Sequence, residues 1–190
     1  MSNYIARYGS QTLANVKVSN LFNYQFQSKK ILYKKVKLIN KRLNPFNIHV
    51  IPLRIRHNKA LIFIYRRDVL SKLLENEEIK NFLRSINYEN INVDDCIKEL
   101  KKRLSRINNF PHELGIFLGY PFNDVISFIE NKGLNYLVNG YWKVYHNPEE
   151  ASEIFNLFDR VKDEIYNNFK NGMPLEYLIV KGEWEYVRFY

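Results

Sequence analysis

The feature that most constrains the fold of this 190-residue chain is a pair of apolar runs joined by a short turn. Ile51, Leu53 and Ile55 alternate with Pro52, Arg54 and Arg56, whereas residues 60–65 are all apolar, and strands are predicted over residues 48–55 and 59–66. The turn-forming residues 57–59 lie between the runs, which predicts an antiparallel β-hairpin. Because proline cannot donate a hydrogen bond to a neighbouring strand, Pro52 places the first strand at a sheet edge. The second strand is predicted to be central and covered by helices.

A third strand is predicted over residues 136–145, where Tyr141 and Lys143 share one face. The end of the chain alternates in the same way around Trp184 and Tyr186, which predicts a further edge strand. Together these patterns predict a small, mainly antiparallel sheet.

Helical periodicity accounts for most of the remaining chain. Ser28 is predicted to cap the start of a helix that ends before Asn44 and Pro45. Asn147 and Gly172 mark the start and the end of a long helix near the end of the chain. Helices are predicted over residues 28–43, 68–74, 77–85, 93–107 and 147–172. The prediction is therefore a single α+β domain over residues 1–180, its sheet packed with helices, followed by a C-terminal extension over residues 181–190.

Composition excludes several classes of protein. Hydrophobic residues make up 46% of the chain, which argues against disorder, and no apolar run is long enough to span a membrane. The first residues lack the apolar stretch of a secretory signal, so a cytoplasmic protein without a membrane partner is expected. Cys96 is the only cysteine, which excludes an internal disulfide and a cysteine-based metal site. The sequence predicts no metal site and identifies no cofactor.

The net charge of +9 raises the question of a polyanionic partner. Basic side chains cluster over residues 29–42 and 98–106, but the same excess would arise from an AT-rich coding sequence. A protein or nucleic-acid partner is therefore the alternative hypothesis. Its predicted contacts are Lys34, Lys41, Lys101 and Arg103.

Residues 110–133 match the spacing of a helix-turn-helix unit. Gly115 would supply the small residue at the helix crossing, and Gly119 the residue free to adopt a positive φ in the turn. The predicted second helix, however, offers mostly apolar or acidic side chains where a DNA-reading helix presents basic and amide groups. The unit is therefore predicted to serve packing.

His112 and Glu113 are the candidate catalytic pair. They follow Pro111, which is favoured at the first position of a helix, where free N–H groups can receive an anion. The pair could act in acid–base chemistry, or Glu113 could cap the helix while His112 is an ordinary surface residue. A zinc-protease helix is excluded because Ile116 stands where the second histidine is required.

The candidate ligand-binding residues interrupt apolar patterns. Lys17 and Asn20 do so in residues 12–22, and Lys143 does so in the predicted third strand, where a long cation must reach solvent or a partner. The prediction places Lys143 and the His112–Glu113 turn around one concavity, with an anionic ligand group between them. The residues predicted to roof this concavity are Tyr120 and Tyr141. The alternative is a Lys143–Glu113 ion pair with no cavity.

Three segments together resemble a bacterial family catalogued as domain of unknown function 3793. They are TLANVKVSNLF (12–22), FPHELGIFLGYPFNDVISFIENKG (110–133) and GYWKVY (140–145), and the likeness extends to about Val180. The resemblance implies no reaction. The functional hypothesis is thus a cytoplasmic small-ligand or cofactor-binding protein with an anion-accepting pocket, its status as an enzyme left open. The alternative is an interaction protein that uses its basic helices.

Overall fold

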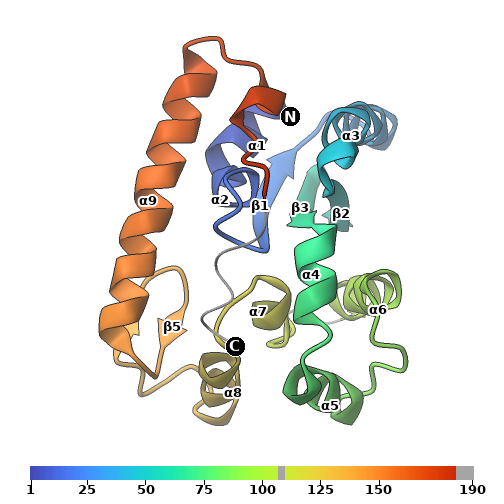
Figure 1. Cartoon of the computed structure of the whole chain (residues 1–190). Helices are drawn as coiled ribbons and strands as arrows, with labels where there is room; N and C mark the ends of the chain where they lie inside the picture. The colour runs from blue at the N-terminus through green and yellow to red at the C-terminus, as the bar shows by residue number, and fades with distance from the viewer. Residues whose placement is uncertain (107–109, 183–190) are drawn as a thin grey trace.

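The computed structural model describes residues 1–106 and 110–182, and it is an α+β fold in which helices pack around small antiparallel sheets (Figure 1). In chain order the described elements are α1 (Ser2–Tyr8), α2 (Ser10–Leu13), β1 (Ser19–Gln25), α3 (Lys29–Leu43), η1 (Asn44–Phe46), β2 (Ile48–Arg56), β3 (Lys59–Arg66), α4 (Arg67–Leu73), α5 (Glu77–Ser85), α6 (Val93–Arg106), α7 (Leu114–Phe117), α8 (Phe122–Glu130), β4 (Val138–Asn139), β5 (Lys143–Val144), α9 (Pro148–Lys170) and η2 (Leu175–Leu178). The predicted fold class is confirmed.

The predicted hairpin is present as β2 and β3. It belongs to a three-stranded antiparallel sheet in the order β1-β3-β2, so β3 is central and β2 is an edge strand, as Pro52 predicts. The pairing of β2 with β3 shifts register between Pro52 and Arg54, which places an irregularity beside the residue that cannot donate.

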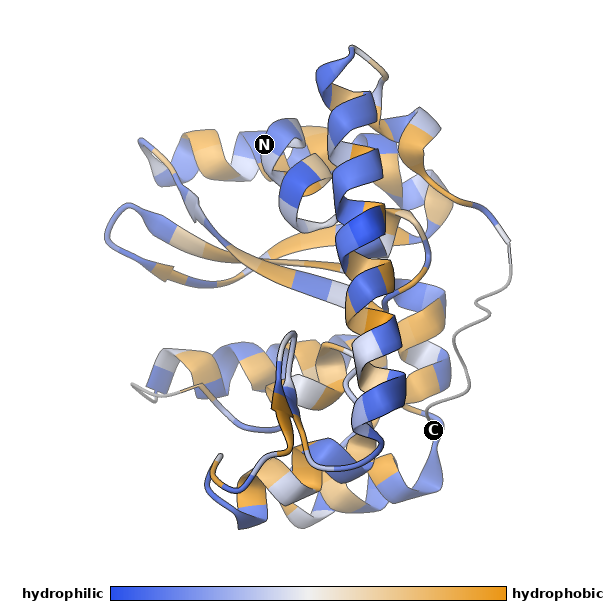
Figure 2. Cartoon of the chain, turned by 90° about the vertical axis from the view of Figure 1, so that its left-hand side faces the viewer, coloured by the Kyte–Doolittle hydropathy of each residue, from blue (hydrophilic) through white to orange (hydrophobic). Residues whose placement is uncertain are grey.

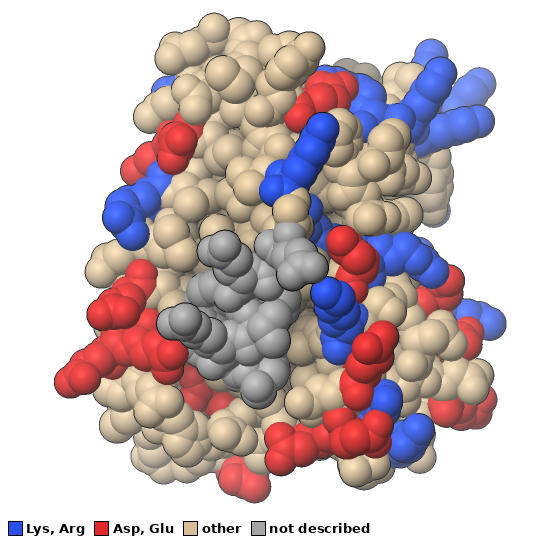
Figure 3. Space-filling view, viewed as in Figure 1, with Lys and Arg blue, Asp and Glu red and all other residues tan. Residues whose placement is uncertain are grey.

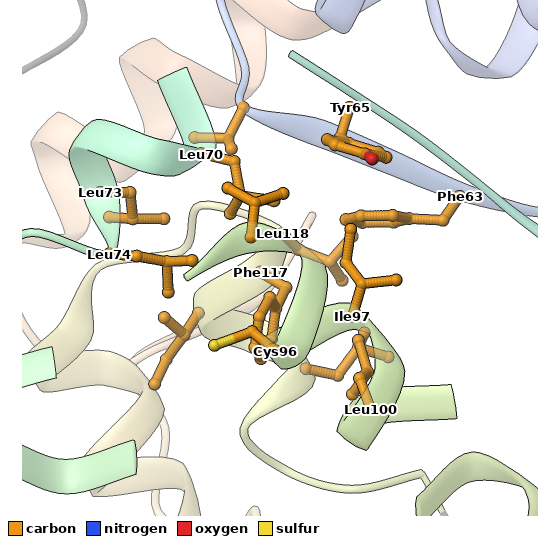
Figure 4. Packing of buried hydrophobic residues seen from close by; sticks show 14 of the residues in the cluster. Phe63, Tyr65, Leu70, Leu73, Leu74, Cys96, Ile97, Leu100, Phe117 and Leu118 are labelled. Carbon is orange, nitrogen blue, oxygen red and sulfur yellow. The ribbon is translucent and has the colours of Figure 1, made fainter. Parts of the chain in front are cut away.

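The central strand supplies side chains to both halves of the core. Because successive side chains of a strand point to opposite faces, Phe63 and Tyr65 enter one hydrophobic cluster and Ile62 and Ile64 enter another. The first cluster is completed by α4, α5, α6 and α7, as Figure 4 shows for part of it. The second is completed mainly by α1, α3 and the end of α9.

The prediction that residues 136–145 form the third strand of this sheet is wrong. The third strand is β1, and among the described residues β4 and β5 pair with each other alone, in a separate hairpin beside α9 (Figure 2). The alternation in this segment has another cause. Trp142 and Val144 are buried against Ile154 and Phe158 of α9, so one face of the hairpin is apolar because it packs on a helix. The predicted edge strand around residues 184 and 186 lies outside the described residues.

The helices lie close to their predicted positions. The side chain of Ser28 accepts a hydrogen bond from the Ile31 N–H at 3.3 Å and caps α3, and Gly172 follows α9 with a φ of +93°. The last residue of the helix predicted over 93–107 lies outside the described residues. None of the described helices combines the length and the apolarity needed to cross a membrane.

The helix predicted to begin at Pro111 begins instead at Leu114, and α7 is a single turn. The N–H groups of Leu114, Gly115 and Ile116 donate to the carbonyls of residues 111–113 at 3.0–3.2 Å. The first three N–H groups of α7 are therefore already bonded within the chain.

The α7–α8 pair is nevertheless packed as the glycine spacing predicts. Gly119 lies in the turn with a φ of +68°, and a Cβ added at Gly115 would lie 2.9 Å from the Val125 side chain. A larger residue at either position would therefore strain the turn or separate the two helices.

Candidate functional site

Two adjoining cavities lie between the three-stranded sheet, the α7–α8 pair and the β4–β5 hairpin. The larger, which we call the Lys17 cleft, has a volume of about 580 Å³ and is lined by residues of α1, α2, β1 and α9 as well as Lys17 itself. The smaller, the His112 cavity, has a volume of about 310 Å³ and is lined by the turn before α7, by α8 and by the hairpin. Their common wall consists of Leu118, Tyr120, Gly140 and Tyr141.

Lys17 is the most unusual side chain of this region. It lies in the connection between α2 and β1, next to the fully buried Val18, and is itself only 4% exposed. Its Nζ atom lies 4.9 Å from the centre of the Tyr120 ring and 5.8 Å from that of Phe158. No carboxylate or carbonyl in the described part of the chain forms an ion pair or hydrogen bond with it. Burial lowers the pKa of Lys17 to about 7.

A buried polar network forms the floor beside Lys17. The Asn20 amide donates to Gln11 Oε1 at 3.1 Å, and the Thr12 hydroxyl donates to Asn20 Oδ1 at 2.6 Å. The Gln11 amide in turn donates to the Phe158 carbonyl at 3.2 Å and to the Tyr141 hydroxyl at 3.4 Å. Each of these amides is therefore held in one orientation by several partners.

Tyr141 connects this network to α9. Its hydroxyl donates to Asp159 Oδ1 at 2.8 Å while it accepts from Gln11. Burial, together with the hydrogen bond to Asp159, raises the pKa of the Tyr141 phenol well above its usual value, so the phenol remains a hydrogen-bond donor at any physiological pH. Asp159 also lies 3.7 Å from Lys162, and Arg7 lines the same cleft from α1.

In the His112 cavity, His112 and Lys143 do line one concavity, and Tyr120 and Tyr141 line it with them. The predicted convergence is therefore present. The ring of His112 lies 5.3 Å from that of Phe128. Lys143, unlike Lys17, has a polar partner, because its Nζ donates to the Gly133 carbonyl at 2.6 Å.

Glu113 takes no part in either cavity. Its side chain is buried and forms an ion pair with Arg103 at 3.1 Å, and it accepts a hydrogen bond from the Tyr88 hydroxyl at 3.3 Å. Glu113 therefore pairs with neither His112 nor Lys143, and the predicted alternative of a Lys143–Glu113 ion pair is wrong. The sequence could not reveal this, since Tyr88 and Arg103 precede Glu113 by 25 and 10 positions.

The residues predicted for a nucleic-acid partner do not form one surface. Lys34 and Lys41 are exposed on α3, which covers one face of the sheet. Lys101 and Arg103 belong to α6, which covers the other face, and the Arg103 guanidinium is bonded to Glu99, Glu113 and the Ile86 carbonyl. On the face seen in Figure 3, basic side chains gather over α3 and acidic ones along the lower part.

Three polar residues around the cavities escaped the sequence-based predictions: Gln11 and Asp124 are buried, and Asp159 is exposed. Gln11 and Asp159 look like ordinary helical positions, and only the fold places them beside Asn20 and Tyr141. Asp124 looks like a first-turn acid of α8, but it accepts hydrogen bonds from Trp142 Nε1 at 2.7 Å and from the N–H groups of residues 145 and 146 at 2.9 and 3.0 Å. It thereby fastens the hairpin to α8. The described residues contain no cluster of His, Cys, Asp and Glu suited to a metal ion.

The three segments singled out in the sequence supply residues to these cavities, and the fold and site define an α+β protein with a buried lysine at the floor of a cleft. The chain belongs to the family described as Protein of unknown function (DUF3793), whose sequence profile matches residues 5–179. The resemblance is confirmed. Neither the curated proteins nor the solved structures yielded a match to the chain.

Proposed function

We propose that the protein binds a small anionic molecule in the Lys17 cleft. The observation that carries the proposal is the Lys17 amine, which is buried against two aromatic rings without a carboxylate partner among the described residues. Burying an ammonium group without a partner costs free energy, and a bound anion would offset that cost. A buried charge whose cost is offset only when a ligand is present is typical of a binding site.

The surrounding groups favour a ligand with polar atoms. Asn20 and Tyr141 are fixed by the network that includes Gln11, so they offer oriented hydrogen-bonding groups. Tyr120 supplies an aromatic wall shared with the His112 cavity. A ligand larger than the cleft would extend past this wall toward His112, which could then exchange a proton with it. Binding is the core of the proposal, and catalysis at His112 is an extension of it.

Protonation of Lys17 gives the proposal a pH dependence. Below pH 7 the amine is mainly ammonium and attracts an anion, whereas at pH 9 only about one lysine in a hundred is charged in the free protein. Anion affinity should therefore fall by up to about 100-fold between pH 6 and pH 9. Among the described residues, the other charged groups that line the cleft are Arg7, Asp159 and Lys162.

A thermal-shift titration with acetate, phosphate and a library of small carboxylates tests the proposal. At least one anion should stabilise the wild type more at pH 6 than at pH 9, relative to chloride at the same ionic strength. Lys17→Met should abolish the effect. Lys143→Met is the matched control, since it removes a lysine that also lies over an aromatic ring but in the neighbouring cavity. Equal stabilisation of wild type and Lys17→Met would contradict the proposal.

The exposed face of α3 favours a second candidate function, which is contact with a polyanionic partner. Tyr33 and Leu38 are 53% and 55% exposed on this helix, which also carries the exposed Lys34 and Lys41. Aromatic and apolar groups interspersed with lysines are suited to a nucleic acid or an acidic protein surface. A cytoplasmic location is common to both candidates, in keeping with a chain whose single cysteine forms no internal disulfide.

A further inference from the structure

We propose that Lys17 is a nucleophile that forms an imine with a carbonyl-containing ligand. The inference rests on the proposed function, because it uses the same cleft and names the reactive class of its ligand: an aldehyde or ketone, in the simplest case one that also carries a carboxylate. It assigns Lys17 a covalent role that binding alone does not require.

The geometry of the Lys17 amine differs from that of an ordinary buried lysine. Buried lysines normally find a carboxylate or several carbonyl oxygens, which hold the amine in its charged form. Here Nζ lies over the faces of Tyr120 and Phe158, 4.9 and 5.8 Å from the ring centres, and the side chain lines a cleft. The nitrogen lone pair can therefore meet a ligand without first breaking a bond to the protein.

Lys143 shows by contrast what an engaged lysine looks like in the same region. Its Nζ lies 4.6 Å from the centre of the Tyr136 ring, but it also donates to the Gly133 carbonyl at 2.6 Å. Attack on a carbonyl by Lys143 would require the loss of this hydrogen bond. Lys143 is therefore a suitable comparison for Lys17, because its amine is hydrogen-bonded to the protein.

The reaction is balanced without any further reactant. The lone pair of the neutral Nζ attacks the carbonyl carbon, and a proton moves from nitrogen to oxygen to give a carbinolamine. The carbon–oxygen bond then breaks, the second Nζ proton is lost, and one water leaves as the carbon–nitrogen double bond forms. The neutral amine is required for the first step, and proton transfer is required for both.

The charges around Lys17 are compatible with a neutral amine near pH 7. Arg7 of α1 and Lys162 of α9 also line the cleft, and Asp159 is shared between Tyr141 and Lys162. Burial lowers the pKa of Lys17 to about 7, so about half of the amine is neutral at that pH. For an unperturbed lysine the neutral fraction is about one in 2,500.

Reductive trapping tests the inference on the full chain. The protein is incubated at pH 7 with cyanoborohydride and either glyoxylate, an anionic aldehyde, or propanal, a neutral one, and the modified peptides are mapped by mass spectrometry. Lys17 should be modified at least about tenfold faster than any other lysine, with a rate that rises with pH around a midpoint near 7. The α-amine of Met1, whose pKa burial also lowers, is scored separately.

Adduct formation in two variants tests whether Lys17 is the nucleophile. Lys17→Met should lose the fast adduct, and Lys143→Met should keep it. Adducts spread over surface lysines with none at Lys17, or a midpoint near pH 10, would overturn the inference. Because the wild-type peptide map identifies the site by itself, the test holds even if one variant folds poorly.

The same samples separate this inference from the proposed function. Acetate has no reactive carbonyl, so stabilisation of the wild type by acetate without a Lys17 adduct would leave anion binding standing and remove the imine. A Lys17 adduct with propanal but no stabilisation by any anion would support the nucleophilic role and contradict anion binding. If neither an adduct nor anion-dependent stabilisation is found, both proposals are wrong.

Discussion

At the scale of single residues, the contrast between Lys17 and its neighbours is an energetic one. A group that is buried without a partner lowers the free energy of unfolding, because the unfolded chain solvates it better. Lys17 is such a group, whereas Arg66, equally buried, donates hydrogen bonds to the carbonyls of Thr12, Leu13 and Val180 at 2.7–2.8 Å. Within the described part of the chain, the rings of Tyr120 and Phe158 offset part of the free energy that burial of Lys17 costs, and no carboxylate or carbonyl offsets the rest.

Lys17→Met should therefore stabilise the ligand-free protein. Burial holds the pKa of Lys17 near 7 in the folded state, against about 10.4 in the unfolded chain, so the penalty is complete below pH 7 and disappears as the pH rises toward 10.4. At pH 6 the gain should be about 1–3 kcal/mol, or roughly 3–10 °C in Tm, and at pH 10 it should be near zero. Calorimetry at the two pH values checks this. A variant less stable than wild type at pH 6 would contradict the account.

Replacement of Glu113, in contrast to that of Lys17, should destabilise the protein. Glu113→Ala leaves the Arg103 guanidinium and the Tyr88 hydroxyl without their buried partner, which should cost about 2–4 kcal/mol. Glu77→Ala is the matched control, because the Glu77–Lys80 pair is exposed and should cost less than about 1 kcal/mol. Urea unfolding of both variants gives the comparison. Similar, small losses would show that Glu113 does not carry the structural role assigned to it.

At the scale of elements, the helices and strands with a regular hydrophobic pattern could be predicted from the sequence. The strand that buries polar side chains could not. The β2–β3 hairpin and α9 follow from their apolar patterns. β1 was missed because its first residues, Ser19 and Asn20, are polar and yet buried, so the strand shows no simple alternation. Lys17, Asn20, Tyr120 and Tyr141 were predicted as ligand residues and do share a cleft, whereas Gln11 and Asp159 carried no signal of their own.

The hairpin β4–β5 depends on Asp124 rather than on the main sheet. Asp124→Ala removes three hydrogen bonds and leaves the Trp142 indole N–H unpaired, which should cost about 2–4 kcal/mol and shift Trp142 fluorescence to longer wavelength as the ring gains water. Asn123→Ala, at an exposed position of the same turn, should change neither. Unchanged emission from Asp124→Ala would show that packing on α9 alone holds the hairpin.

At the scale of the whole molecule, positive charge is not concentrated on one surface. The basic helices α3 and α6 cover opposite faces of the sheet, and acidic side chains lie between and below them on the face in Figure 3. A net charge of +9 spread in this way favours weak, diffuse attraction to polyanions over a defined groove.

Any nucleic-acid binding should therefore be weak and limited to α3. If it occurs, Lys34→Ala with Lys41→Ala should abolish it, and Lys101→Ala should not. Affinity should fall by less than about tenfold between 50 and 200 mM salt, because few phosphates can be contacted at once. Fluorescence anisotropy with a labelled oligonucleotide measures this. A loss of several orders of magnitude would indicate an extensive interface that this fold does not present.

The charge state of Lys17 tests the central claim most directly. A ¹³C-NMR titration of the labelled lysine side chains, assigned with Lys17→Met, reports its pKa in the free protein and in the presence of the best-stabilising anion. We predict a pKa near 7 for Lys17 in the free protein and a clear rise when the anion is bound, because the bound charge favours the ammonium. A Lys17 that titrates near 10.4 in the free protein and does not respond to any anion would contradict it.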